Sequence, residues 1–197
     1  MLLVTTTEES PCAECARLYG ATCCSRKDGD GPRMPITYGD AALVSRWAGK
    51  DGISGVVSMP CDEGVIADLL GEEAALLVVH GRALYLPTLP NGDCLYLGPK
   101  GCTIPSAKPA VCSLFPFKPS AAGQVSLGYV GQPGYCYGQD IGQDDLTSTM
   151  KVFGETLATL QFKVARWRTN LRQHRMLFSQ WQKRSGLHEN RAPTRKR

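Results

Sequence analysis

The spacing of nine cysteines is the feature that most constrains how this chain can fold. Eight of them form an early and a late group, and Cys61 stands alone between the groups. In the early group, two residues separate Cys12 from Cys15, a spacing that lets both sulfurs face one metal ion from a tight turn. The eight grouped cysteines are Cys12, Cys15, Cys23, Cys24, Cys94, Cys102, Cys112 and Cys136. This concentration of thiols predicts a site for a metal ion or an iron–sulfur cluster.

The start of the chain bears on whether these thiols form disulfides. The opening MLLVTTTEESP has no basic segment, and its apolar stretch ends after Val4, unlike a secretory signal. No run approaches the roughly 18 apolar residues that suggest a membrane span. We therefore expect a cytoplasmic protein without a membrane segment, in which clustered cysteines bind metal or carry out redox chemistry. The odd cysteine count also argues against a complete disulfide framework.

The chemistry of thiolates narrows the choice of metal. They favour zinc, Cu(I) or iron–sulfur centres over magnesium or calcium. Four thiolates are the usual ligand set of structural zinc and of iron–sulfur clusters, so eight could serve one site with spare thiols, or two sites. Cys23 and Cys24 are adjacent, and adjacent side chains in extended structure point in opposite directions. These two sulfurs could serve different sites, or one could be a ligand and the other a packed side chain.

Three passages carry a resemblance to a known family. They are CAECARLYGATCC at residues 12–24, NGDCLYLGPKGCTIPSAKPAVCSLFPF at residues 91–117 and GYCYGQDIG at residues 134–142. Over about residues 10–142 the chain resembles the YkgJ-type cysteine-cluster proteins, a family of zinc- or iron-chelating domains with a CxxCxxCC signature. That family is related to the cysteine domain of flagellin lysine-N-methylase, which is associated with an iron–sulfur cluster.

The resemblance implies a ligand set and a cofactor. The eight cysteines that match are the eight grouped above, whereas Cys61 has no counterpart. The implied cofactor is an iron–sulfur cluster, of the 4Fe–4S type, or zinc. The chain departs from the family pattern in three places. Seven residues separate Cys15 from Cys23 where the family has fewer, Lys108 replaces an arginine, and Pro105 replaces an aromatic residue.

Three functions follow as hypotheses. The first is binding of a metal or an iron–sulfur cluster, used in redox chemistry or in support of a protein-modification reaction. The second is a structural zinc module for protein–protein interaction, in which the metal only folds the loops. The third is a lysine-methylase-like enzyme, which is disfavoured because no recognisable nucleotide-type cofactor loop is present. No catalytic residue is assigned.

The predicted fold is a small, loop-rich α+β domain organised by metal over residues 1–143, followed by a long basic amphipathic helix at 144–186 and a disordered basic tail at 187–197. Thr37 and Asp40 form a capping pattern for a helix that ends before Gly49. Asp62 caps a second helix, Glu63 to Leu70, which Gly71 stops. We also expect a turn of helix near residues 13–18.

Short strands are predicted at Ala75–Val79, Arg82–Leu86 and Gln124–Val130. Residues 87–120 contain seven prolines, which forbid a continuous helix and a central strand. We expect this segment to be held by something other than backbone ladders, and residues 50–61 to form a loop.

The C-terminal region repeats apolar residues at alternating spacings of three and four, which predicts one helix that starts at Asp144 or Asp145 and ends at Gly186. We expect this seam, including His174, to pack onto the preceding domain; the alternative is a homodimer or another protein partner. The seam residues are Met150, Phe153, Leu157, Leu160, Val164, Trp167, Leu171, His174, Phe178 and Trp181.

Charge is divided unevenly along the chain. Residues 1–143 hold 10 Lys and Arg against 14 Asp and Glu, whereas residues 144–197 hold 12 against 4. The basic arm is interpreted as a solvated face that complements the acidic body. Binding of nucleic acid remains open, although the arm contains no recognised DNA-binding motif.

Overall fold

The structure is a computed structural model that describes residues 34–119, 124–128, 143 and 145–187. Five predicted ligands lie outside these residues, as do the expected helical turn near residues 13–18 and the tail after Leu187. These ligands are Cys12, Cys15, Cys23, Cys24 and Cys136. The predictions for them stay predictions.

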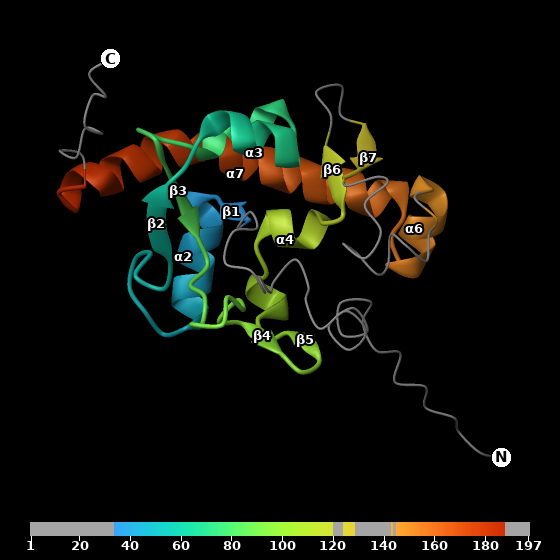
Figure 1. Cartoon of the computed structure of the whole chain (residues 1–197), viewed down its shortest axis with the longest axis horizontal. Helices are drawn as coiled ribbons and strands as arrows, with labels where there is room; N and C mark the ends of the chain where they lie inside the picture. Colours follow the sequence, from blue (N-terminus) through green and yellow to red (C-terminus); the bar gives the residue numbers. More distant parts are fainter. Residues whose placement is uncertain (1–33, 120–123, 129–142, 144, 188–197) are drawn as a thin grey trace.

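Helix α7 (Leu157–Arg184) runs along the long axis of the molecule, and other elements lie on both sides of it in this view (Figure 1). Helices α2 (Tyr38–Trp47) and α4 (Ala110–Leu114) both contact it, as does the 3-10 helix η1 (Glu72–Leu77). The combination of helices with small antiparallel sheets confirms the α+β class and the long C-terminal helix.

The largest sheet has three antiparallel strands in the order β1 (Pro35–Ile36), β3 (Arg82–Tyr85) and β2 (Val57–Pro60). The predicted strand at residues 82–86 is confirmed as the central strand β3. Both edge strands carry a proline, which suits an edge because proline cannot donate a hydrogen bond to a neighbouring strand. The sequence prediction missed both edge strands, and it described residues 50–61 as a loop.

Two helices begin and end where the sequence predicted. The hydroxyl of Thr37 accepts a 3.1 Å hydrogen bond from the Asp40 amide at the start of α2. A carboxylate oxygen of Asp62 accepts a 2.8 Å bond from the Gly64 amide, and α3 (Glu63–Leu70) follows. Gly71, at a φ of 92°, then stops α3. Local capping therefore determines both starts.

The strand predicted at Ala75–Val79 is wrong, because residues 72–77 form η1 instead. This turn buries Ala74 and Leu77 against α3 and α7. Glu72 and Glu73 lie in its first turn, where negative charge favours a helical start. Periodicity cannot separate strand from helix in an apolar run this short.

The proline-rich segment contains no long element, as expected. It forms strands β4 (Leu97–Gly98) and β5 (Gly101–Cys102), the 3-10 helix η2 (Pro105–Ala107), helix α4 and strand β6 (Phe117–Pro119). Backbone ladders do contribute here, contrary to the prediction, because β4 pairs with β5 and β6 pairs with β7 (Val125–Leu127). Strand β7 confirms the strand predicted around residues 124–130.

The prediction of one continuous helix over 144–186 is also wrong. Asp145 caps a short helix α6 (Leu146–Val152), and α7 starts separately at Leu157. Gly154 adopts a φ of 64° between them. Thr156 and Thr159 then form a reciprocal cap at 2.9 and 3.1 Å. The end of α7 is as predicted, since Gly186 follows it at a φ of 67°.

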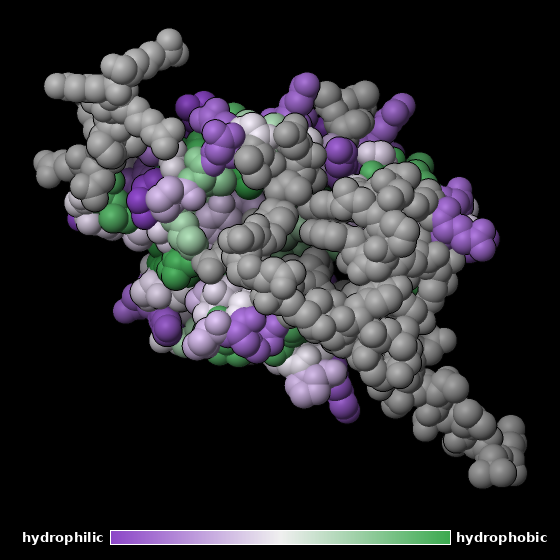
Figure 2. All heavy atoms as spheres, in the orientation of Figure 1, coloured by the Kyte–Doolittle hydropathy of each residue, from purple (hydrophilic) through white to green (hydrophobic). Residues whose placement is uncertain are grey.

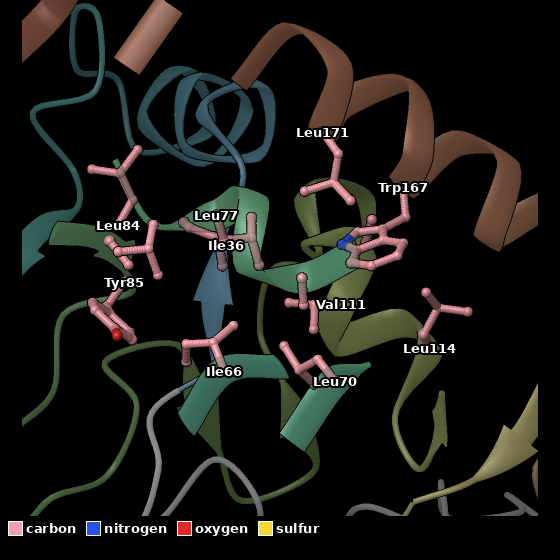
Figure 3. Packing of buried hydrophobic residues seen from close by; sticks show 14 of the residues in the cluster. Ile36, Ile66, Leu70, Leu77, Leu84, Tyr85, Val111, Leu114, Trp167 and Leu171 are labelled. Atoms are coloured by element: carbon pink, nitrogen blue, oxygen red, sulfur yellow. The ribbon is translucent and has the colours of Figure 1, made fainter. Parts of the chain in front are cut away.

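Most of the seam of α7 packs into the main hydrophobic core, as expected, but Leu157 at its start is 49% exposed. Trp167 and Leu171 lie over Val111 and Leu77, with Leu70 and Leu114 nearby (Figure 3). Phe178 is also fully buried. Complete burial of one large apolar side chain stabilises a fold by about 1.5–3 kcal/mol. Helix α7 is therefore part of the core.

The described surface in Figure 2 is a mosaic of hydrophilic and hydrophobic residues. Among the helices of the described part of the chain, none combines the length and the apolar character that crossing a bilayer requires.

Candidate metal centre

Three of the eight predicted ligands lie in the described part of the chain. Cys94, Cys102 and Cys112 are all partly buried, and so is Cys61. Each belongs to a different local structure, described below in chain order.

Cys94 closes a tight loop that starts at Pro87. The Leu95 amide donates to the Pro87 carbonyl at 2.9 Å, and Thr88 pairs with Cys94 as an isolated bridge. Inside the loop, the Leu89 amide donates to the Asp93 carbonyl at 2.7 Å. These backbone bonds fix where the Cys94 side chain leaves the loop.

Cys102 lies on the hairpin that follows. The amide of Leu97 donates to the Cys94 carbonyl at 2.9 Å, and Leu97 is paired with Cys102 across the β4–β5 ladder. Gly101 makes the turn with a φ of 96°. A Cβ on Gly98 would lie 2.8 Å from the Thr103 side chain. Glycine at both positions lets the hairpin close, with Cys102 on its second strand.

Cys94 and Cys102 meet on one small apolar cluster. Both side chains pack against it, although seven residues separate them in sequence. The cluster joins α2, the hairpin region and η2, and it consists of Val44, Tyr96, Ile104 and Ala107. Two soft donors are thus held on one surface by the core of the domain.

The electrostatics of Tyr96 reflect its closeness to Cys94. Burial raises the pKa of the Tyr96 phenol above its usual value of 10.0, and the negative charge of a Cys94 thiolate acts in the same direction. Tyr96 also meets Trp47 edge to face, with ring centroids 6.0 Å apart. The phenol therefore stays protonated beside the thiol.

Cys112 lies on the one-turn helix α4 and packs against the main core. The start of α4 is held by Asp40, whose carboxylate accepts a 3.3 Å bond from the Ala110 amide. The same carboxylate accepts from the Thr37 hydroxyl at 2.8 Å and from the Asn170 amide group at 3.3 Å. One side chain thus connects α2, α4 and α7.

Asp40 is only 1% exposed. Burial raises the pKa of its carboxyl, while the hydrogen bonds from Thr37 and Ala110 act in the opposite direction. Sequence reasoning identified Asp40 only as part of a helix cap. Its bonds to Ala110 and Asn170 span 70 and 130 residues, and no local signal reveals them.

The described residues do not assemble a complete metal site by themselves. Within residues 34–119, 124–128, 143 and 145–187, no three His, Cys, Asp or Glu side chains are grouped closely enough to hold an ion. The structure brings Cys94 and Cys102 to one cluster and places Cys112 on the neighbouring core. Their soft, partly buried thiols fit zinc or an iron–sulfur centre in donor chemistry.

Cys61 occupies a different environment. It packs against the main core beside strand β2, and its thiol lies 3.6 Å from the Asp62 carbonyl. It does not belong to the cluster beneath Cys94 and Cys102. Cys112 also packs against the main core, so this placement does not separate Cys61 from the predicted ligands, and its exclusion stays a prediction.

His174 is packed, as predicted, and both of its ring nitrogens are occupied. Nδ1 accepts a 2.8 Å bond from the Tyr38 amide, so Nε2 carries the proton that it donates to the Leu77 carbonyl at 3.0 Å. Burial lowers the pKa of His174 to about 4. The ring is a neutral cross-link within the core, with no nitrogen left for a metal.

No family model matches this chain, and comparison with curated proteins and with solved structures found no similar protein.

Proposed function

We propose that this protein binds an iron–sulfur cluster of the 4Fe–4S type through cysteine thiolates. The observation that carries the proposal is the convergence of Cys94 and Cys102 on one apolar cluster. Both cysteines belong to the passage of the sequence that most resembles the YkgJ-type proteins. The buried apolar residues beneath the two cysteines would hold an iron–sulfur cluster rigidly. Because the thiols are partly exposed, a partner protein could still approach the bound iron–sulfur cluster.

The ligands would come from the eight predicted cysteines, so the early group and Cys136 would complete a site that Cys94, Cys102 and Cys112 begin. When bound, the cluster would supply one-electron chemistry, either for electron transfer or in support of a protein-modification reaction. Metal would then organise the loops beside the core. Thiolates of this kind persist in a reducing compartment, which supports a cytoplasmic location.

A structural zinc module that mediates protein–protein interaction is the second candidate. The observation that favours it is the size of the β4–β5 hairpin, whose strands have only two residues each. A hairpin with strands this short is not stable without an additional cross-link. A zinc ion bound by four thiolates is a common cross-link in small loop-rich proteins.

Composition analysis after anaerobic purification separates the two candidates. The cluster predicts brown protein with stoichiometric iron and acid-labile sulfide, and with a charge-transfer absorbance that reduction bleaches. Colourless protein with stoichiometric zinc and no sulfide would rule out the cluster and establish the zinc module. Protein that binds neither metal after anaerobic reconstitution would rule out both.

Serine variants test the ligand set. Cys94→Ser, Cys102→Ser and Cys112→Ser should each lower the bound metal and change its spectrum, because a hydroxyl does not replace a thiolate. Cys61→Ser is the matched control, since Cys61 is also partly buried but lies outside the three passages that carry the resemblance. Equal metal loss in all four variants would contradict the proposed set.

A further inference from the structure

Helix α7 carries seven basic residues and no acidic one over its 28 residues. The body of the protein neutralises only part of this charge. Arg168 donates to both carboxylate oxygens of Glu73, at 2.7 and 3.0 Å. Lys163 pairs with Glu155, and Arg166 donates to the Lys108 carbonyl at 3.4 Å. Of these three, only Arg168 pairs with a carboxylate of the acidic body, because Glu155 lies in the C-terminal region and the Lys108 carbonyl is uncharged.

The other four cations are exposed and form no ion pair with any residue that the structure describes. They are Arg172, Arg175, Lys183 and Arg184. Lys183 and Arg184 lie in the last turn, where cations also offset the helix dipole. The helix dipole does not account for Arg172 and Arg175, because both lie well before the last turn of α7. The four span about 18 Å of the helix axis.

Two exposed apolar side chains lie on the same helix. Phe162 is 72% exposed and Met176 is 58% exposed, the two largest values among the large hydrophobic residues of the described chain. They are separated by about four helical turns, so they lie on one side of α7. We use the name outer face for the exposed half of α7 opposite its buried seam, where Arg175 and Arg184 lie toward opposite edges. It consists of Phe162, Arg172, Arg175, Met176, Lys183 and Arg184.

We propose that the outer face of α7 binds the phosphate backbone of nucleic acid. Arginine guanidinium groups pair well with phosphate oxygens, and three of the four unpaired cations are arginine. The exposed ring of Phe162 offers a surface on which an unpaired base can stack. The sequence continues the positive charge beyond the helix with Arg191, Arg195, Lys196 and Arg197. This proposal does not depend on the metal centre.

Other partners fit the outer face less well. A second copy that paired through the same face of α7 would bring like charges together. The centre of a protein interface is depleted in charge, whereas Arg172 lies near the middle of this surface. A helix that binds a lipid bilayer inserts its apolar side into the membrane interface. The apolar side of α7 is instead buried in the core of the protein.

Fluorescence anisotropy with the full chain tests the proposal. The probes are a labelled DNA duplex and a labelled single-stranded RNA, each longer than the helix, titrated over a range of salt concentrations. We expect binding that weakens steeply with salt, because each neutralised phosphate adds about −0.9 to the logarithmic slope on a duplex. Arg172→Glu with Arg175→Glu should raise the dissociation constant at least about tenfold and reduce that slope by about two.

The matched control is Lys50→Glu with Lys151→Glu, which makes the same change in net charge at exposed positions outside α7. Thermal unfolding of both double variants checks that the fold is retained. Phe162→Ser should weaken binding of the single strand more than binding of the duplex. Equal effects of the two charge reversals would overturn the proposal, and so would the absence of binding at low salt. Displacement by polyglutamate or by phosphatidylserine vesicles as effective as that by nucleic acid would also overturn it.

Discussion

The backbone amide of Tyr38 donates a 2.8 Å hydrogen bond to Nδ1 of His174, and so ties the first turn of α2 to the middle of α7. Since Nε2 donates to the Leu77 carbonyl, the ring holds three elements together in its neutral form. A second proton would displace the Tyr38 bond, because Nδ1 can accept only while it is deprotonated.

This relationship makes stability depend on pH. The pKa of His174 is about 4 in the folded protein, against an ordinary value of 6.5. Between these values the unfolded chain binds more protons than the native state, so stability falls as the pH drops from about 6.5 toward about 4. The expected total loss is about 3 kcal/mol. Urea unfolding at several pH values measures it.

The control for this prediction is His174→Gln, because the raised pKa of Asp40 contributes to the pH dependence with the opposite sign. The raised pKa of Asp40 makes its contribution more favourable as the pH falls. The stability difference between wild type and His174→Gln should therefore narrow on acidification. A difference that stays constant from neutral pH to the acid range would contradict the assignment.

Asp40 gives a second prediction, about charge and hydrogen bonding. Asp40→Ala leaves the Ala110 amide and the Thr37 hydroxyl without their acceptor and should destabilise the fold by about 2–4 kcal/mol. Asp40→Asn should cost clearly less, because burial already penalises the carboxylate and the amide oxygen still accepts. Chemical denaturation of both variants provides the comparison. If the asparagine variant were as unstable as the alanine variant, the negative charge itself would be needed.

Gly71 combines an unusual backbone angle with a close approach. Its φ is 92°, and an added Cβ would lie 2.9 Å from the Pro119 carbonyl oxygen. With a ψ of 159°, its backbone also lies in a region that essentially only glycine adopts, so Gly71→Ala should cost more than the roughly 1–2 kcal/mol of a left-handed alanine. Gly49→Ala is the control, since Gly49 has a φ of 67° with open space around it. Thermal unfolding should rank Gly71→Ala as clearly the less stable, and equal melting temperatures would argue against the steric contact.

Trp167 tests the contribution of α7 to the core. The side chain is 1% exposed, and its indole nitrogen has no hydrogen-bond partner among the described residues. Trp167→Ala should cost about 3–5 kcal/mol, as truncations of large core side chains do. Trp47→Ala should cost much less, because Trp47 is 49% exposed. Guanidinium denaturation of the two variants measures the contrast, and similar midpoints would mean that α7 contributes little to the core.

Local signals determined what the sequence could predict. Thr37 and Asp62 cap their helices through bonds to residues two or three positions away, so α2 and α3 could be bounded in advance. The seam of α7 could also be predicted, because its apolar residues keep the same alternating spacing over many turns. The break between α6 and α7 was obscured, since Phe153 and Leu157 continue the apolar spacing across Gly154.

Long-range contacts determined what the sequence could not predict. The bonds from Asp40 to Ala110 and to Asn170 join positions that no spacing rule relates. The edge strands β1 and β2 exist only because β3 pairs with both of them. For the candidate site, the cysteine pattern predicted Cys94 and Cys102 as ligands. It could not predict that both pack against Val44 and Tyr96, because that packing depends on the tertiary structure.

The three bonds to Asp40 have a practical consequence for anyone who shortens this protein. Removal of the C-terminal region would take away Asn170 and the apolar cover supplied by Trp167 and Phe178. The segment that bears Cys112 would then lose support from residues more than fifty positions downstream. A minimal version of the cysteine domain must therefore extend through Gly186, because truncation after residue 143 would remove these contacts.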